Sequence, residues 1–288
     1  MRTSPVVSAE LRQVLRRLRL GPMLETLPER LTLARQNHMP HQDFLELVLA
    51  DEVTRRDRTS AALRARTARL DPSMVLEAWD ETANVTFDKQ LWAELTTLRF
   101  LEEAHNVLVL GPVGVGKTFL ASALCHIACR RRRTVIAERA DRLLKRLKAS
   151  RLDNSHEAEM RRLIRVDLLL VDDLALQPLD SVETADIYEI VVERHRRAST
   201  LVTSNREPSE WLPLMADPLL AQSAVDRLQS AAYELVVEGE SYRRRQKPRL
   251  GASPAEEKDE EGLESNKLDD HARRVPLRRP PRPETEAS

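Results

Sequence analysis

Short apolar runs that alternate with longer segments of helical spacing dominate the middle of the chain. The runs lack polar alternation and span residues 107–110, 135–137, 168–171 and 201–203. Such runs are typical of parallel strands that are buried on both faces. The segments between them, such as 118–130 and 182–198, have the length and spacing of helices. The pattern therefore predicts an α/β fold in which helices flank a doubly wound parallel sheet.

A helical pattern without strand signals occupies the chain from Ser8 to about Leu70. Leu11, Leu15 and Leu18 recur at three- and four-residue spacing after Ser8, which is a typical helix start. The region ends in an arginine-rich helix with Arg55, Arg56, Arg58, Arg64, Arg66 and Arg69. Only Asp57 lies among these arginines, so we expect pairing within the helix to leave its face positive. Either solvent or a phosphate backbone would balance that charge.

The composition changes again after Pro248, where Pro, Glu, Asp, Arg and Lys replace most apolar residues. Such a segment buries too little apolar area to offset the entropy of ordering, so it is predicted to be disordered. We therefore expect an N-terminal helical domain (residues 1–75), a globular core (residues 76–248) and a charged tail (residues 249–288).

Overall composition excludes few partners. The formal net charge is zero, but basic runs in the first half are balanced by acidic stretches late in the chain, so nucleic acid remains a candidate partner. Cys125 and Cys129 have no second pair to complete a zinc site, and we expect them to be buried thiols. No apolar run approaches the roughly 18 residues of a membrane span, and the start lacks a signal-peptide core, so a cytoplasmic location without membrane contact is expected.

The strongest motif of the chain is a glycine-rich loop that follows the first apolar run directly and precedes a helical segment. It reads Gly111, Pro112, Val113, Gly114, Val115, Gly116, Lys117 and Thr118, and it fits the phosphate-loop pattern in full. The glycines allow successive backbone N–H groups to face a β-phosphate. We expect Lys117 to contact the β- and γ-phosphates and Thr118 to ligate magnesium. The motif predicts a site for ATP and Mg²⁺.

Polar residues follow two further apolar runs at the positions where strands end. Asp172 and Asp173 come after the run at 168–171, and Asn205 follows the run at 201–203. Asp172 is expected to hold the magnesium through water, and Asp173 to orient and deprotonate the attacking water. Asn205 is expected either to position that water or the γ-phosphate, or to form a turn.

Several stretches of the chain resemble the IstB-like ATP-binding proteins. These are helper ATPases encoded beside the transposase of a class of bacterial insertion sequences, and they are related to DnaC and DnaA within the AAA+ group. The similar stretches are residues 100–118, 167–179, 199–211 (STLVTSNREPSEW), 217–232 (DPLLAQSAVDRLQSAA) and 239–243. The resemblance covers roughly residues 8–248 and is weaker in the N-terminal helices.

The resemblance implies roles that spacing alone does not supply. Arg227 matches an arginine finger that completes the ATP site of a neighbouring subunit, and Arg243 matches a second sensor of the γ-phosphate. Many AAA+ ATPases carry Asp-Glu where this chain has Asp172-Asp173, which implies slower hydrolysis. The implied protein is an AAA+ ATPase with ATP at the interfaces of a homo-oligomer. It would assemble on DNA without sequence preference and stimulate a partner transposase.

Two further interpretations remain open at this stage. A DnaC-like helicase loader would share the same core but grip a helicase with its N-terminal helices. A metabolic P-loop kinase would need a lid and an acceptor pocket, for which the sequence shows no signal. The basic runs at residues 130–133 and 139–148 are expected either to line a DNA channel in an assembled ring or to form a solubilising surface.

Overall fold

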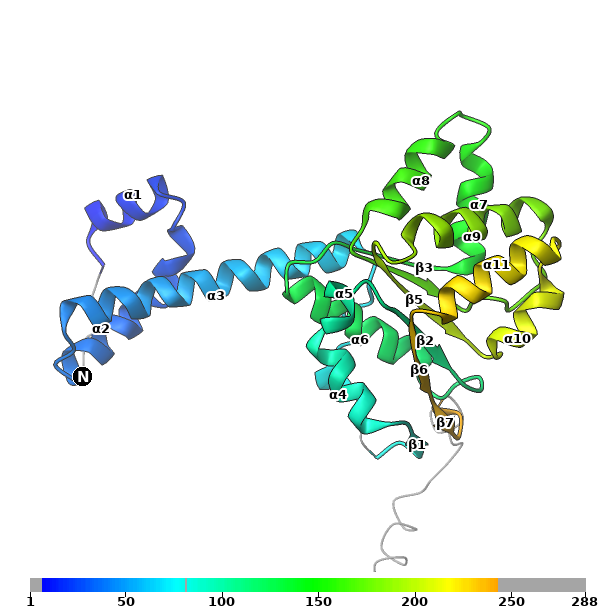
Figure 1. Ribbon diagram of the computed structural model, residues 1–288. Helices are drawn as coiled ribbons and strands as arrows, with labels where there is room; N and C mark the ends of the chain where they lie inside the picture. Colours follow the sequence, from blue (N-terminus) through cyan, green and yellow to red (C-terminus); the bar gives the residue numbers. More distant parts are fainter. Residues whose placement is uncertain (1–6, 81, 243–288) are drawn as a thin grey trace, which may run out of the picture. The chain divides into compact units, whose positions relative to one another are not determined.

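A five-stranded parallel sheet forms the centre of the computed structural model, which describes residues 7–80 and 82–242 (Figure 1). The strand order is β3-β4-β5-β2-β6. The strands are β2 (Asn106–Leu110), β3 (Val135–Arg139), β4 (Leu168–Asp172), β5 (Ser199–Ser204) and β6 (Ala232–Val236). The predicted parallel strands are confirmed. The edge strand β6 was not expected, because only Leu235 of its five residues is buried and its sequence lacks a continuous apolar run.

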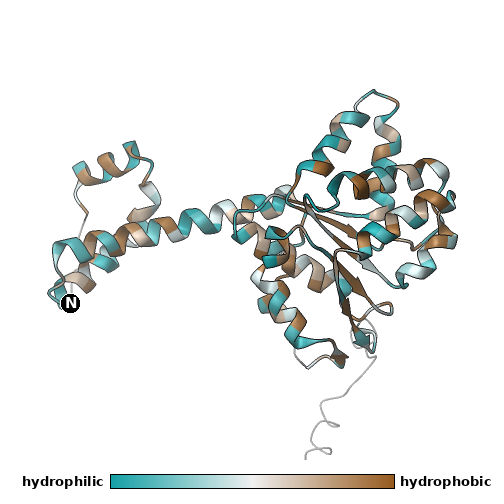
Figure 2. Cartoon of the chain, in the orientation of Figure 1, coloured by the Kyte–Doolittle hydropathy of each residue, from teal (hydrophilic) through white to brown (hydrophobic). Residues whose placement is uncertain are grey.

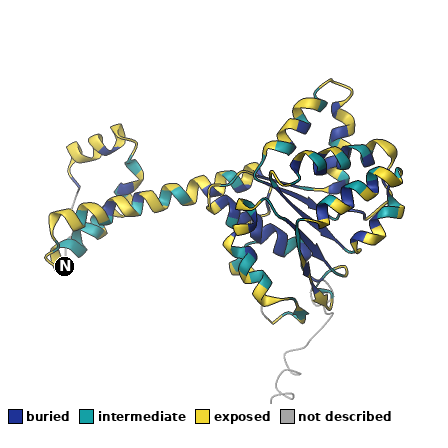
Figure 3. Ribbon diagram, in the orientation of Figure 1, coloured by how far each residue is buried: buried dark blue, intermediate teal, exposed yellow. Residues whose placement is uncertain are grey.

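Helices cover both faces of this sheet, so the predicted doubly wound arrangement is confirmed. One face packs against α7 (Ala140–Ser150), α8 (His156–Arg165), α9 (Ser181–Arg194) and α11 (Pro218–Gln229). The other packs against α4 (Lys89–Thr97), α5 (Arg99–Glu102) and α6 (Lys117–Arg130). Leu108 and Leu110 of β2 enter the first core, whereas Val107 and Val109 enter the second. β2, β4 and β5 are accordingly buried along their length (Figure 3), and the centre of the sheet is mainly hydrophobic (Figure 2).

Two very short strands lie outside the main sheet. β1 (Val85–Thr86) pairs antiparallel with β7 (Glu238–Gly239), which brings the segment before α4 against the segment after β6. The remaining elements of the core are α10 (Pro208–Trp211) and the 3₁₀ turns Leu76–Ala78 and Leu212–Leu214.

The N-terminal region is helical, as its pattern predicts. It contains α1 (Ala9–Arg17), a 3₁₀ turn (Gly21–Glu25), α2 (Leu27–Gln36) and α3 (His41–Thr67). Ser8 caps α1, because its hydroxyl accepts a hydrogen bond of 3.2 Å from the Leu11 N–H. A small apolar cluster joins the helices, with Val7, Leu15, Met23, Leu27 and Val48 buried.

The second half of α3 packs on α6. Arg64 Nε donates to the Cys129 carbonyl at 2.8 Å, and the Ala137 N–H donates to the Ala68 carbonyl at 3.2 Å. The long helix therefore runs without a break from the N-terminal cluster to the core, and the domain boundary near residue 75 stays a prediction. Cys125 and Cys129 are buried free thiols, as expected. Among the described residues, no helix is both long and apolar enough to cross a membrane.

A buried arginine ties three elements of the first core together. Arg194, at the end of α9, is 1% exposed, and its guanidinium donates to the carbonyls of Leu163, Val166 and Ser199. The first two carbonyls belong to the end of α8 and the turn after it, where helical partners are missing. Burial lowers the pKa of Arg194 to about 10. This pKa is still well above 7, so the guanidinium stays charged at neutral pH, and the charge of Asp167 favours that state.

Replacement of Arg194 by Met should destabilise the protein by about 3 kcal/mol, because it leaves several buried carbonyl groups without a donor. Arg197→Met is the control, since Arg197 is exposed and pairs only with Glu193 on the helix surface. We expect that control to cost less than about 1 kcal/mol. Urea unfolding measures both values, and equal losses would show that the buried arginine contributes no more than a surface ion pair.

Candidate functional site

The phosphate loop connects β2 to α6 at the carboxyl edge of the sheet. Gly111, Gly114 and Gly116 have φ values of 146°, 90° and 96°, a range that side chains disfavour. The Lys117 ammonium donates to the Pro112 carbonyl at 2.7 Å. With these conformations the loop backbone turns from the end of β2 into the first turn of α6, as the motif predicts.

Each of the three glycines is also approached closely by another part of the chain. A Cβ atom at Gly111 would lie 2.0 Å from the Val237 carbonyl oxygen, and one at Gly114 would lie 2.2 Å from the Ser241 hydroxyl. A Cβ atom at Gly116 would lie 3.0 Å from the Trp79 ring, and Trp79 in turn contacts Phe119 on α6. None of these contacts was predicted, since the contacting residues lie far from the loop in the sequence.

The segment after β6 is hydrogen-bonded directly to the phosphate loop and its strand. The Val237 N–H donates to the Leu110 carbonyl at 2.7 Å, and the Tyr242 N–H donates to the Gly114 carbonyl at 2.9 Å. We call residues 237–242 the loop strap. The strap and Trp79 determine the shape of the loop together with its own glycines.

The acid of β4 lies beside the first turn of α6. The Thr118 hydroxyl donates to Asp172 Oδ1 at 2.9 Å, so the structure brings together the two residues predicted to hold magnesium. Strand alternation explains this placement: Leu168 and Leu170 face the core that contains α6, and Asp172 is the next residue on that side.

Asp172 also contacts a second threonine, which no sequence motif indicated. Thr203, at the end of the neighbouring strand β5, donates its hydroxyl proton to Asp172 Oδ1 at 2.6 Å and accepts the Asp173 N–H at 2.8 Å. Asp173 has a φ of 56°, a left-handed conformation, and its half-exposed carboxylate lies 3.8 Å from Arg139 Nε. Thr203 lies on the same side of β5 as Leu201, which faces α6. The alternation of side chains along the strand could therefore have identified Thr203 from the sequence.

The electrostatics of Asp172 fit a magnesium ion. Burial raises the pKa of Asp172 above its ordinary value, and the hydroxyls of Thr203 and Thr118 act in the opposite direction. A carboxylate and a hydroxyl are the hard oxygen donors that Mg²⁺ prefers, and Mg²⁺ usually keeps several waters and substrate phosphates as its remaining ligands. Among residues 7–80 and 82–242, no three or more His, Cys, Asp or Glu side chains are placed together so that they could hold a metal ion.

Within the described part of the chain, Asn205 and Arg227 form no hydrogen bond to this cluster. Asn205 follows β5 directly and is half-buried. Arg227 lies near the end of α11, where its guanidinium donates to the Ser223 carbonyl at 2.9 Å and to the Ser223 hydroxyl. Arg243 lies outside the described residues. The roles assigned to these three residues and to Asp173 remain predictions.

The expectation that acids leave the arginine-rich helix unneutralised is wrong for part of α3. Arg55 and Arg56 both pair with Glu52, which is 4% exposed and lies one turn before them. The Arg55 hydrogen bond is the main reason why the pKa of Glu52 falls to about 2. Asp57 pairs with Arg132 instead. The prediction failed because it considered only acids that lie among the arginines.

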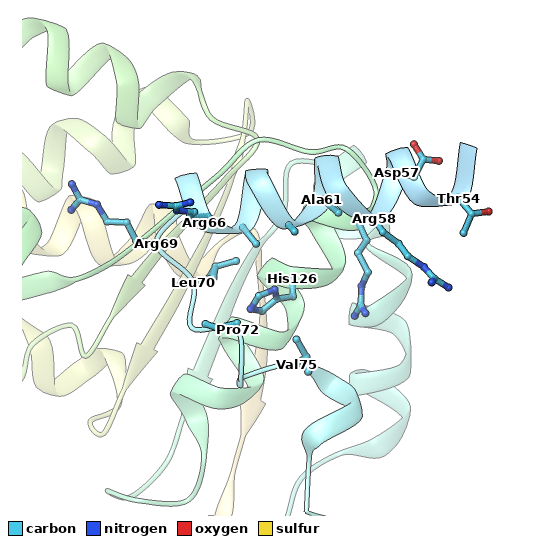
Figure 4. Close-up of a pocket in the computed structure, with 13 residues that line it drawn as sticks. Thr54, Asp57, Arg58, Ala61, Arg66, Arg69, Leu70, Pro72, Val75 and His126 are labelled. Carbon is cyan, nitrogen blue, oxygen red and sulfur yellow. The ribbon is translucent and has the colours of Figure 1, made fainter. Parts of the chain in front are cut away.

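A basic cavity adjoins α3 rather than the phosphate loop. It has a volume of about 780 Å³. Its walls come from α3, which contributes Ala61, Ala62 and Ala65, from the segment that follows α3, and from α6 (Figure 4). Arg58 and Arg66 line it and have no ion pair among the described residues, whereas Arg69 pairs with Glu138 and Arg130 with Glu77.

Most of the other basic side chains predicted to line a channel are also paired. Arg133 contacts Glu102, Arg146 contacts Glu138, and Lys148 contacts Asp180. These ion pairs reduce the positive charge that the two basic runs present to a partner. They leave Arg58 and Arg66 as the two cavity arginines whose charge no acid in the described residues offsets.

The fold and site together define a P-loop nucleotide-binding protein. The phosphate-loop strand β2 lies between β5 and β6, and β4, which carries Asp172, lies one strand beyond β5. A family model described as IstB-like ATP binding protein matches residues 13–250. The chain belongs to this family.

The relatives of the chain include ATP-binding proteins of insertion sequences. One from Mycobacterium tuberculosis is 34% identical over 239 residues, which cover 83% of this chain and 95% of the relative. The ATP-binding protein of insertion sequence IS21 from Pseudomonas aeruginosa is 31% identical over 242 residues, which cover 84% and 91%. Among solved structures, the DnaC helicase loader is 20% identical, with a TM-score of 0.49 over 58% of this chain and 98% of that chain. The structural likeness is too weak to carry an argument.

Replacement of Lys117 by Ala should abolish ATP binding, because the ammonium group is the expected partner of the β- and γ-phosphates. Lys89→Ala is the control, since Lys89 is an exposed residue of α4 with the same charge. Titration with a fluorescent ATP analogue measures both variants. Retention of wild-type affinity by Lys117→Ala would contradict the assignment of the loop as the nucleotide site.

Proposed function

We propose that this chain is an ATP hydrolase whose catalytic centre lies at the carboxyl edge of β4 and β5. The contact between Thr118 and Asp172 carries the proposal, because it joins the phosphate loop to a buried acid at the place where a γ-phosphate and Mg²⁺ would lie. Asp173 is the proposed base that deprotonates the attacking water, and Asn205 orients that water or the γ-phosphate. ATP and Mg²⁺ are the proposed cofactors.

The site is completed by a neighbouring subunit in this proposal. Arg227 contacts Ser223 on its own helix and has no hydrogen bond to the phosphate loop of its own chain. An arginine finger that acts in trans explains this position, and it makes ATP a bridge between protomers of a homo-oligomer. Arg243 is proposed as a sensor within the same subunit.

The wider proposal is a helper ATPase of a transposition system that assembles on DNA and stimulates a partner transposase. Relatives named as insertion-sequence ATP-binding proteins support this role. The N-terminal helices, residues 1–75, are the proposed partner- and DNA-binding domain. They expose apolar side chains at helical spacing, Leu45, Leu49 and Val53 on α3, which suits contact with a protein partner. Co-purification with a replicative helicase instead would favour the alternative, a DnaC-like loader.

Replacement of Arg227 by Ala should leave ATP binding intact but lower hydrolysis about a thousandfold, because a finger contributes mainly to the transition state. ATP-dependent oligomers should also be lost. Arg197→Ala is the control, because it removes an exposed arginine that pairs with Glu193. Steady-state ATPase rates and particle size are measured together.

A mixture of Arg227→Ala and Lys117→Ala subunits separates action in trans from action in cis. The first variant keeps a nucleotide site and the second keeps a finger, so hydrolysis should partly recover in mixed oligomers. Wild-type turnover by Arg227→Ala alone would show that the finger is assigned to the wrong residue. No recovery in mixed oligomers would place the finger in cis.

The unpaired cavity arginines should contribute to DNA binding more than paired ones do. Arg58→Gln with Arg66→Gln should weaken duplex binding and reduce the slope of log affinity against log salt by about two, because two phosphate contacts are lost. Arg161→Gln with Arg197→Gln is the control, since these arginines pair with Glu157 and Glu193 on helix surfaces and the charge change is the same. Fluorescence anisotropy with duplex DNA at several salt concentrations measures the slopes. Equal slopes for the two double variants would exclude the cavity as a DNA-binding site. DNA would be excluded as the partner if the chain showed no salt-dependent retention on DNA and duplex DNA did not change the ATPase rate.

A further inference from the structure

Thr203 contacts both acids of the candidate site at once. Its hydroxyl oxygen accepts the Asp173 N–H, and its proton points to Asp172 Oδ1. Since the oxygen is engaged by one neighbour and the proton by the other, the hydroxyl has a single favourable orientation. Thr203 is 0% exposed, so water does not compete for these hydrogen bonds.

The backbone of Thr203 holds the same turn from the other side. Its carbonyl accepts the Leu174 N–H at 2.9 Å, so one residue of β5 binds two successive N–H groups after β4. Asp173 lies between these bonds in a left-handed conformation, which a residue other than glycine adopts only when its surroundings stabilise it. The direction of the Asp173 carboxylate therefore depends on Thr203.

The two threonines that contact Asp172 differ in what else they do. Thr118 lies on the phosphate loop, and its oxygen is the expected magnesium ligand. Thr203 lies near the end of β5, and the other hydrogen bond of its hydroxyl group comes from the Asp173 backbone N–H. Only the hydrogen bond from Thr203 is thus independent of whether metal and nucleotide are bound.

We propose that Thr203 is a positioning residue that aims Asp172 at the magnesium ion and Asp173 at the attacking water. The role of Thr203 toward Asp173 rests on the proposed ATPase function. Its role toward Asp172 requires only that nucleotide binding depends on Mg²⁺. Loss of the Thr203 hydroxyl then affects the metal requirement as well as turnover, whereas a residue that only stabilises the fold affects neither.

The test compares three variants on β5 with the wild-type full chain. Thr203→Val keeps the shape of the side chain but removes the hydroxyl, and Thr203→Ser restores it. Thr200→Val removes another buried hydroxyl of the same strand, one that contacts Arg194 far from the acids. Two readouts are used: the affinity for the fluorescent analogue mant-ATP as a function of Mg²⁺ concentration, and kcat and KM for ATP hydrolysis at saturating Mg²⁺.

For Thr203→Val we expect the Mg²⁺ concentration at half-maximal mant-ATP affinity to rise about tenfold, with affinity in the absence of Mg²⁺ unchanged. We expect kcat to fall about tenfold or more, while KM changes less. Thr203→Ser should lie within about twofold of wild type in both readouts, and Thr200→Val should keep the wild-type Mg²⁺ dependence even if it is less stable.

The outcomes separate this proposal from the proposed function. A wild-type chain that binds mant-ATP in a Mg²⁺-dependent manner without hydrolysing ATP would overturn the ATPase proposal. The expected shift of the Mg²⁺ dependence in Thr203→Val would still support the role of Thr203 toward Asp172. Wild-type Mg²⁺ dependence in Thr203→Val, an equal loss in Thr200→Val, or no recovery in Thr203→Ser would each overturn the positioning role. Absence of any Mg²⁺ effect on wild-type binding would overturn it as well.

Discussion

Burial of the Asp172 carboxylate is the constraint on which the candidate site depends. A charged group in this position is costly unless hydrogen bonds or a cation offset the loss of water. The hydroxyls of Thr118 and Thr203 supply part of that compensation from α6 and β5. The residual rise in the pKa of Asp172 shows that the compensation by protein groups is incomplete. A divalent cation beside the carboxylate would supply the rest, in agreement with the proposed Mg²⁺ site.

The parallel sheet determines which elements meet at this point. Because β2, β4 and β5 run parallel, their carboxyl ends lie at one edge, and the residues on the α6 side of each strand face the start of that helix. Between the polar residues that begin β2 and β5 (Asn106, Ser199 and Thr200) and this edge, the three strands carry only apolar side chains. The apolar strands therefore support the fold, while the residues at their ends are available for chemistry.

The strands and the phosphate loop could be predicted from sequence because their signals are local. Continuous apolar runs identify β2 to β5, and the spacing of Gly111, Gly116 and Lys117 identifies the loop. Thr203 and β6 escaped prediction for different reasons. Thr203 resembles any β-branched strand residue until the register places it opposite Asp172, and β6 buries little apolar surface. The pairing of Arg55 and Arg56 with Glu52 was missed because an acid one turn upstream was left out of the charge balance.

The phosphate-loop glycines form a local motif, but residues distant in the sequence also contact them. The motif explains these glycines by the approach of a phosphate to the backbone, yet Gly111 and Gly114 are also in contact with the loop strap and Gly116 with Trp79. The strap is held by β1–β7 pairing and by the bond from the Tyr242 N–H to the Gly114 carbonyl. A side chain at Gly111 or Gly114 would displace the strap. The shape of the phosphate loop and the position of the strap are thus coupled through the same few atoms, because neither segment can move into the space of the other.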